Sequence, residues 1–469
     1  MFVKHNPIFM IFLDRENEKQ RLDASLSSDD AQLVVIYGRR RIGKSTLIRQ
    51  VLKESDIYFL AHLSNAILQR EQFAEAIAEQ ITGFNDVIYP SWESLFSNLR
   101  NSLRKPLTIC IDEFPYLVKK SPELPSLIQK IFDEPADRSY HLVLCGSSQQ
   151  MMQGLVLDSS APLYGRANQI LKINPLHQGW IQEAIHCYPV EAVQEFSVWG
   201  GIPRYWELRA QEDSFESAIK NQVLDRLGVL HEEPLRLLAD DMRESVQAFS
   251  ILTLVGRGIQ KLSEIAARLG KPATHISRPL DKLIQLGYLK RETPYGTSPR
   301  SGKKSLYKIS DPFITFYFTF VESNLSRLEL GLIDQVYRSI TPKLSHYVAN
   351  EWENMCRTCI PFEPLNGIEF NAAARWWGTN INGDKMELDL VCESLDKKYL
   401  LVGECKWSTI NNPERLLYEL RAKAELLPGK KPVKILTMLF VRELKQKSKP
   451  HKQTENIFTP IDVLKRLRN

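Results

Sequence analysis

The stretch from residue 33 to residue 52 has glycine, lysine and serine at the spacing of a phosphate-binding loop. It reads LVVIYGRRRIGKSTLIRQVL, so four residues separate Gly38 from Gly43, and Lys44 and Ser45 follow at once. An apolar, β-branched run precedes the glycines and a helix-compatible run follows them, which is the context that this chemistry needs. Glycines let backbone N–H groups close around phosphate oxygens, and the helix N-terminus adds a favourable partial charge. The pattern therefore predicts binding of ATP.

Different residues of this loop are expected to bind the nucleotide and its metal ion. We expect Lys44 to reach the β- and γ-phosphates and the Ser45 hydroxyl to bind Mg²⁺. The expected nucleotide contacts form one continuous loop: Gly38, Arg39, Arg40, Arg41, Ile42, Gly43, Lys44, Ser45 and Thr46.

Polar residues also end two further apolar runs. LTICIDEF ends in Asp112 and Glu113, and HLVLCGSS ends in Ser147 and Ser148. We expect Asp112 to hold Mg²⁺ through water and Glu113 to orient the attacking water as the catalytic base. Ser147 is placed to sense the γ-phosphate. The alternative for the two acids is a strand that simply ends in solvated carboxylates.

A third group of charged residues lies near the C-terminus, in MELDLVCESLDKKYLLVGECKW at residues 386–407. Side chains alternate faces along a strand, so Glu387 points with Asp389, and Glu404 points with Lys406. Charges gathered at one end of an apolar hairpin repel or lose hydration unless they are paired or bind metal. The pattern favours Asp389 and Glu404 as Mg²⁺ ligands, with Lys406 positioning or deprotonating water as a third catalytic group. Glu387 is an alternative ligand, and a salt bridge on a solvated face is the alternative to any metal site.

The positive charge of the chain is concentrated in two segments. The net charge is +5, but residues 245–310 hold twelve Lys and Arg against three Asp and Glu, and residues 401–469 hold fifteen against seven. Such segments suggest surfaces that meet a polyanion. Within 245–310, two amphipathic helices precede a hairpin, and the outward-facing positions of the second helix are Arg278 and Lys282. The hairpin tip carries Arg300, Lys303 and Lys304.

Length and composition limit the architecture. At 469 residues the chain is too long for one core, and two to four domains are expected at about 100–200 residues each. No apolar run approaches the roughly 20 residues that span a bilayer, and the N-terminal PIFMIFL lacks a cleavage-site pattern. Cysteines in strand-like apolar stretches are typical of a reduced, cytoplasmic protein. Cys356 and Cys359 form one CxxC without a second pair at zinc spacing, so a metal or redox role is disfavoured.

The motifs of the first half together resemble those of the archaeal-type P-loop ATPases, within the AAA+ and STAND assemblage. The resemblance runs from residue 12 to about residue 205 and includes the F-x-x-R-E-x-E box at Phe12 to Glu18. It implies that PLYGR supplies an arginine finger, Arg166, which would stabilise charge on the transferred phosphoryl group. A structural ion pair is the alternative for Arg166. The GGIPRYW motif resembles the family's lid, in which Arg204 is a less certain second sensor.

Two later segments resemble other known folds. Helix–turn–helix followed by a basic hairpin resembles a winged helix, whose second helix enters the DNA major groove and whose wing contacts the backbone. Use of such a domain for protein contact is the alternative. The order of helix, E-x-D and E-x-K hairpin, helix and strand resembles the PD-(D/E)xK nuclease-like superfamily. More narrowly, it resembles the uncharacterised C-terminal domain of many archaeal-type ATPases, and this resemblance implies Glu353 as a further, helix-borne metal ligand.

These inferences predict an α/β fold class with several modules. The expected modules are a P-loop ATPase core with a parallel sheet and flanking helices (1–185), a helical lid (186–244), a winged helix-turn-helix (245–310), linker helices (311–345) and a restriction-endonuclease-like domain (346–469). The predicted function is ATP hydrolysis coupled to DNA binding and Mg²⁺-dependent DNA cleavage by a cytoplasmic homo-oligomer that does not bind membranes. The alternatives are a nucleotide-switched DNA-binding regulator and a STAND-like signalling ATPase, each with a silent nuclease fold.

Overall fold

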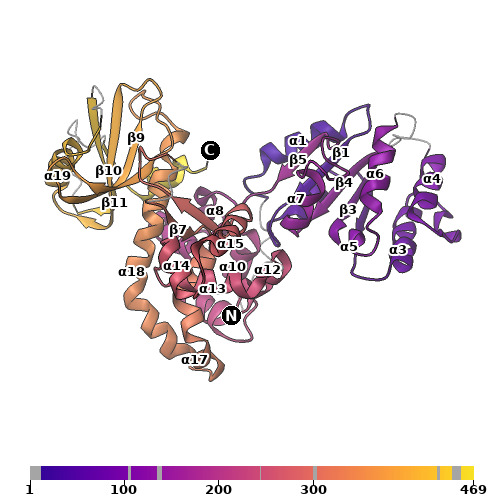
Figure 1. Cartoon of the computed structure of the whole chain (residues 1–469), viewed down its shortest axis with the longest axis horizontal. Coiled ribbons are helices and arrows are strands. Elements are labelled where there is room, and N and C mark those ends of the chain that lie inside the picture. Colours follow the sequence, from indigo (N-terminus) through magenta and orange to yellow (C-terminus); the bar gives the residue numbers. More distant parts are fainter. Residues whose placement is uncertain are drawn as a thin grey trace, which may run out of the picture. The chain divides into compact units, whose positions relative to one another are not determined.

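The computed structural model describes residues 12–103, 107–134, 140–242, 244–298, 304–429, 434–445 and 456–468. Arg300, Lys303 and most of the PIFMIFL stretch lie outside these ranges. The chain forms two compact units, one of residues 15–175 with 240–242, and one of residues 1–14, 176–239 and 243–469. Figure 1 shows the elements of both units.

The first unit, the ATPase unit, is built on a five-stranded parallel sheet in the order β2-β3-β4-β1-β5. The three central strands are fully buried, as expected for parallel strands covered on both faces. The strands are β1 (Leu33–Tyr37), β2 (Ile57–Leu60), β3 (Thr108–Asp112), β4 (His141–Gly146) and β5 (Gln169–Lys172). In this strand order β1 lies beside β4, and β4 beside β3, so their carboxyl ends meet at one edge of the sheet.

Helices pack on both faces of this sheet and bury an aromatic core. Phe59, Phe73, Trp92 and Phe96 pack together in that core, with ring centroids 5.0–6.2 Å apart. The helices are α1 (Glu16–Leu26), α2 (Lys44–Arg49), α3 (Ala66–Ala78), η1 (Phe84–Asp86), α4 (Trp92–Ser102), α5 (Phe114–Val118), α6 (Leu124–Asp133) and α7 (Gln149–Val156).

The second unit begins with short helices that surround the buried GGIPRYW motif. Trp199 and Trp206 are fully buried, and the Trp206 indole donates to the carbonyl of Gly200 at 2.6 Å. These helices are η3 (Gln178–Trp180), α8 (Ile181–Ile185), α9 (Pro189–Trp199), α10 (Pro203–Ala210), α11 (Phe215–Ala218), η4 (Ile219–Leu224) and α12 (Glu233–Asp241).

A helix–helix–hairpin segment follows, as the sequence predicts. Helices α13 (Ser245–Gly256), α14 (Leu262–Arg268) and α15 (Ala273–Gln285) precede the antiparallel pair β6 (Leu289–Glu292) and β7 (Leu306–Ile309). The face of α15 toward its neighbours carries Ile276, Leu280 and Leu283, all fully buried. The aromatic run after β7 is also buried, as α16 (Pro312–Phe316) and η5 (Tyr317–Val321).

The C-terminal part is a five-stranded mixed sheet preceded by a long helix. After η6 (Glu322–Asn324) and α17 (Leu325–Glu329), α18 (Ile333–Thr358) runs without a break through residues 345 and 346, where the sequence places a module boundary. The strand order is β12-β11-β10-β9-β8, with β10 antiparallel to β9 and parallel to β11. The elements are η7 (Ile360–Phe362), β8 (Ala374–Thr379), β9 (Lys385–Glu393), β10 (Tyr399–Ile410), α19 (Pro413–Glu425), β11 (Lys434–Leu444), β12 (Ile457–Phe458) and α20 (Pro460–Arg466).

The β6–β7 hairpin lies against this C-terminal sheet. The backbone N–H of Tyr295 donates to the carbonyl of Arg375 on β8 at 2.8 Å, and the Tyr295 ring packs on the apolar core between the sheet and α19. Arg375 also pairs with Glu292 on β6 at 3.3 Å. The described part of the hairpin is therefore occupied by contacts within the protein. Across the described residues, none of the helices has both the length and the apolar character required for a bilayer span.

Candidate functional sites

The phosphate loop connects β1 to α2, and its backbone depends on two glycines. Gly43 precedes α2 with φ +92°, a conformation that side chains other than glycine rarely adopt. A Cβ atom on Gly38 would lie 2.6 Å from the carbonyl oxygen of Ile173, so the loop passes too close to its neighbour for any side chain there.

Lys44 is folded into the loop. Its ammonium donates to the carbonyls of Gly38 and Arg39, at 3.0 and 3.1 Å, and only 6% of the side chain is exposed. These bonds hold the positive charge where the loop closes, which is where phosphate oxygens would be bound. The neighbouring side chains differ in exposure: Arg40 and Thr46 are exposed, while Arg39 and Ile42 are buried and Arg41 is partly buried.

Asp112 lies at the end of β3, directly beside the loop. Its Oδ2 accepts hydrogen bonds from Ser45 Oγ and from Tyr58 OH, both at 2.6 Å, and its Oδ1 accepts from the Glu113 N–H at 2.9 Å. Burial opposes ionisation of Asp112, but the hydrogen bonds from Ser45 and Tyr58 outweigh it and hold its pKa below the usual value. The structure thus brings together a hydroxyl and an ionised carboxylate, which are oxygen donors that Mg²⁺ prefers.

Glu113 and Ser147 also meet at this edge of the sheet. Glu113 Oε2 accepts hydrogen bonds from Ser147 Oγ at 2.9 Å and from the Ser147 N–H at 3.1 Å. Glu113 has φ +56°, a strained backbone conformation for a residue with a side chain. The side chain of the expected base is therefore held by the expected sensor on the neighbouring strand.

The two arginines expected beyond the loop are both engaged in ion pairs. Arg166 makes a two-pronged pair with Asp133, at 2.7 and 3.0 Å, on the surface of the ATPase unit. Arg204 pairs with Glu207 one helical turn away, at 2.7 Å. The exposed Arg166 pair matches the ion-pair alternative for that residue. Water screens an exposed pair of this kind, so Arg166 can exchange partners.

The C-terminal carboxylates lie on adjacent strands. Gly403 on β10 pairs with Leu390 on β9, so the next pair along the register brings Glu404 opposite Asp389. Asp389 Oδ2 accepts from the Cys405 N–H at 2.9 Å. Lys406 pairs with Glu404 at 2.6 Å, and Lys423 on α19 approaches the other Glu404 oxygen at 3.7 Å. The residues that the sequence assigns to one face are therefore gathered there.

The electrostatics of this carboxylate centre favour a cation. Burial and the negative charges of Glu353 and Glu404 raise the pKa of Asp389 to about 6. Burial would lower the pKa of Lys406, but its hydrogen bond to Glu404 raises it above the usual value. Mutual repulsion among three carboxylates is the cost that a bound divalent ion relieves.

Side chains around the centre fix its geometry. Arg357 on α18 donates to the carbonyl of Asp389 at 2.7 Å and to Glu353 at 3.4 Å. Glu387, the alternative ligand, is exposed and pairs instead with Arg375. Within the described ranges, no three His, Cys, Asp or Glu side chains are already arranged around one metal position. Two carboxylates are nevertheless enough for Mg²⁺, which usually keeps waters or substrate phosphates as its other ligands.

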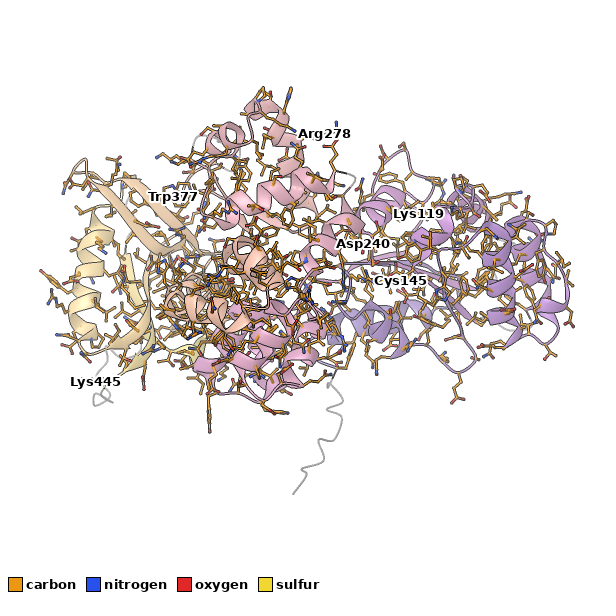
Figure 2. All side chains as sticks on the ribbon, turned by 90° about the horizontal axis from the view of Figure 1, so that it is seen from below. Lys119, Cys145, Asp240, Arg278, Trp377 and Lys445 are labelled. Carbon is orange, nitrogen blue, oxygen red and sulfur yellow. The ribbon has the colours of Figure 1, made fainter. Side chains whose placement is uncertain are left out.

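The burial of the cysteines and the exposure of the basic residues on and after α15 bear on further expectations from the sequence. All seven cysteines are free thiols, and Cys356 and Cys359 are buried in the helix–sheet interface. Cys145 lies inside the ATPase sheet (Figure 2), as expected for a small apolar residue. Arg278 is exposed on α15 and projects from the helix in Figure 2, while Lys282 is partly exposed on the same helix and Lys304 is exposed two residues before β7.

Sequence reasoning missed three residues that hold these centres. Tyr58 contacts Asp112 from 54 positions away, and nothing near Tyr58 in the sequence signals that contact. Lys423 lies 19 positions after Glu404, on a helix that packs across its strand. Arg357 was open to prediction, because it lies one helical turn after Glu353.

Comparison with known proteins places these sites in a family context. A family model described as an ATPase domain predominantly from Archaea matches residues 12–205, and one described as archaeal and bacterial proteins of unknown function matches residues 317–416. An uncharacterised protein of Methanocaldococcus jannaschii, MJECL04, is 30% identical over 425 residues, covering 89% of this chain and 92% of that protein.

Comparison with solved structures also finds similar chains. The Walker-type ATPase PABY2304 of Pyrococcus abyssi has 20% identity and a TM-score of 0.50, covering 65% of this chain and 95% of its own. The Aeropyrum pernix Orc1 protein, solved in complex with DNA, has 16% identity and a TM-score of 0.32, covering 68% of this chain and 95% of its own. The first likeness supports a P-loop ATPase fold.

Proposed function

Because the chain belongs to the family of its archaeal relative, with an archaeal-type P-loop ATPase domain and a C-terminal domain of unknown function, we propose that it couples ATP hydrolysis to DNA binding and cleavage. The observation that carries the ATPase part is the meeting of Lys44, Ser45 and Asp112 at one edge of the parallel sheet. The observation that carries the cleavage part is the gathering of Asp389, Glu404 and Lys406 on one face of β9 and β10.

In the proposed hydrolysis, Lys44 and Glu113 exchange their observed hydrogen-bond partners for the nucleotide and the attacking water. Lys44 leaves the loop carbonyls and binds the β- and γ-phosphates. Ser45 and Asp112 would hold Mg²⁺, which would neutralise developing phosphate charge. Tyr58 keeps Asp112 oriented through its short hydrogen bond. Glu113 leaves Ser147 and orients the attacking water, and Ser147 is then free to contact the γ-phosphate.

We expect Glu113→Gln to bind ATP as the wild type does but to hydrolyse it about 10²- to 10⁴-fold more slowly, which is the usual contribution of a positioned base. Glutamine keeps an oxygen that accepts the hydrogen bonds from Ser147 but cannot accept a proton from water. Steady-state phosphate release measures the rate, and equilibrium binding of a fluorescent ATP analogue measures affinity. Undiminished hydrolysis would remove Glu113 from the role of base.

In the proposed cleavage, Asp389 and Glu404 would hold Mg²⁺, with Glu353 on α18 as a further ligand. The metal ion would supply water activation and charge neutralisation on the scissile phosphate. Lys406 exchanges its pair with Glu404 for a contact with the attacking water or the phosphate oxygen. Arg357 keeps Glu353 and the strand of Asp389 in place. The test is incubation of the purified chain with supercoiled and linear DNA, Mg²⁺ or Mn²⁺, with and without ATP.

We further propose that α13–α15 and the β6–β7 hairpin form a winged helix that contacts duplex DNA through α15. The support is the exposed cation at Arg278 and the partly exposed one at Lys282, on the face opposite Ile276, Leu280 and Leu283. The hairpin contributes less than a wing usually does, because Glu292 and Tyr295 are engaged with β8.

We expect Arg278→Ala with Lys282→Ala to weaken duplex binding and to make the log–log salt slope shallower by about 2, because each lost phosphate contact removes about 0.9. ATP hydrolysis should not change. Fluorescence anisotropy across a salt series measures both quantities, with Arg338→Ala, an exposed arginine on α18, as the matched control. Affinity equal to that of the wild type would place the DNA surface elsewhere, and salt-independent binding would favour the signalling ATPase.

One observation favours a second function, a nucleotide-switched DNA-binding regulator with a silent C-terminal centre. Glu404 already has two lysine partners, Lys406 and Lys423, so its charge is balanced without a metal ion. In this case DNA binding would depend on nucleotide, and no metal ion would support cleavage of any DNA substrate.

A further inference from the structure

The second unit contains a pocket of about 720 Å³, here called the hairpin pocket. It is bounded by the β6–β7 hairpin, by the α16–η5 segment and by the middle of α18, with Arg375 of β8 on one side. Its volume lies within the roughly 300–1,000 Å³ that is typical of ligand sites. Nothing in the proposed ATPase centre or on the exposed face of α15 uses it.

The charged lining of the hairpin pocket is mainly positive. Four side chains are cations and two are carboxylates: Lys290, Lys308, Lys343, Arg375, Glu351 and Glu353. Glu292 lies behind Lys308 and Arg375 and pairs with both, at 2.8 and 3.3 Å, so their positions are fixed by the protein. Lys343 is exposed on α18, and His346 is exposed one turn further on. Cations from four elements, β6, β7, α18 and β8, therefore line one pocket.

Lys290 is the cation whose environment most needs an anion. Its side chain is partly buried between β6 and α18, and its ammonium has a hydrogen bond of 3.3 Å to Asn354 Oδ1. Burial lowers the pKa of Lys290, and the nearby Glu351 only partly offsets this. A phosphate oxygen in the pocket would give Lys290 an anionic partner beside Asn354.

The hairpin pocket is connected to the carboxylate centre. Glu353, the helix-borne acid of that centre, is itself part of the pocket wall. Asn354 bonds both Lys290 and Arg357, and Arg357 donates to the carbonyl of Asp389 at 2.7 Å. A ligand bound to Lys290 would therefore be linked, through Asn354 and Arg357, to the residues proposed to bind Mg²⁺.

We propose that the hairpin pocket binds the phosphodiester backbone of a single nucleic-acid strand and leads that strand to Glu353, Asp389 and Glu404. Lys290 and Lys343 donate to phosphate oxygens, while Phe320 and Tyr347 provide apolar surface for the sugar and base. The volume of the hairpin pocket is sufficient for about one nucleotide of a single strand and is too small for a duplex. This inference deepens the proposed cleavage function and gives the hairpin lysines a place in the same site.

The test measures binding without metal, so it does not depend on cleavage. A fluorescently labelled, 12-nucleotide single-stranded DNA is titrated with the full chain in EDTA, and binding is followed by anisotropy. Lys343 and His346 are both exposed, and we expect Lys343→Ala with His346→Ala to weaken binding roughly tenfold. Lys290→Gln should do the same, with thermal unfolding as its folding control. Lys465→Ala, an exposed lysine on α20, should bind as the wild type does.

The outcomes separate the possible occupants. Unchanged oligonucleotide affinity in both variants would overturn the proposal. So would variants that lose affinity for thymidine 3′,5′-bisphosphate but not for the oligonucleotide, because the occupant would then be a free nucleotide. If the variants lose oligonucleotide affinity while the wild type cleaves no DNA with any metal ion, the strand site stands and the proposed cleavage fails.

Discussion

Lys44→Ala is expected to abolish measurable ATP hydrolysis and to weaken ATP binding by about 100-fold. The Lys44 ammonium is folded against the loop carbonyls of Gly38 and Arg39, at the position where phosphate oxygens would be bound. Two charge-assisted hydrogen bonds to phosphate contribute about 3 kcal/mol, and 1.4 kcal/mol corresponds to a tenfold change in affinity. Alanine has no group that can donate these hydrogen bonds. A water molecule in place of the ammonium carries no positive charge.

Binding is measured by titration with a fluorescent ATP analogue and hydrolysis by phosphate release. The matched control is Lys120→Ala, an exposed lysine of the same unit, which should leave both unchanged. Circular dichroism and thermal unfolding check that Lys44→Ala keeps its fold, since the loop carbonyls it leaves can bond to water. ATP affinity equal to that of the wild type in a folded variant would show that nucleotide binds elsewhere.

The ATPase unit was accessible to sequence reasoning because its signals are local. Gly43, Lys44 and Ser45 are adjacent, and the preceding strand is apolar at every position, so the loop and its context were both visible. Asp112 could be paired with Ser45 because the carboxyl ends of parallel strands meet at one edge of a sheet. The hydrogen bond of 2.6 Å between these two side chains agrees with that reasoning.

The parts that escaped prediction depend on contacts between distant segments. Tyr58 reaches Asp112 only because β2 lies beside β3. The sequence of neither strand indicates that the two are neighbours in the sheet. The hairpin after α15 was expected at a DNA backbone, but Tyr295 and Glu292 contact β8 some 80 residues later. A basic hairpin has the same local pattern whether its partner is a polyanion or another part of the chain.

The carboxylate centre was predictable from the sequence only in part. The alternation of Glu404 and Lys406 on one strand face follows from strand geometry alone, and the register between β9 and β10 then brings Asp389 opposite Glu404. The choice between Asp389 and Glu387 needed the structure. Strand alternation puts Glu387 on the same face as Asp389. Glu387 lies near the start of β9, however, where its carboxylate pairs with Arg375.

Glu404→Ala with Lys406→Ala is expected to reduce Mg²⁺-dependent DNA cleavage about 10³-fold or more. The loss of Glu404 removes one of the two strand-borne metal ligands, and metal-ion catalysis contributes several kcal/mol to phosphate-ester hydrolysis. Replacing both residues avoids leaving the lysine without its partner, because Lys406 and Glu404 pair at 2.6 Å. ATP hydrolysis and duplex binding should persist, since Lys44, Asp112 and Arg278 are untouched.

Conversion of supercoiled plasmid to nicked and linear forms measures the rate, beside Glu414→Ala, an exposed acid at the start of α19. Single variants sharpen the result: Glu404→Gln keeps the shape of the side chain and should lose metal-dependent activity, whereas Lys406→Arg keeps the charge and should retain part of it. Cleavage that survives in the double variant would come from another centre or a contaminant. Absence of cleavage in the wild type with every metal ion, with DNA binding intact, would mean that Lys406 and Lys423 hold Glu404 in a structural role, and the regulator would be the better description.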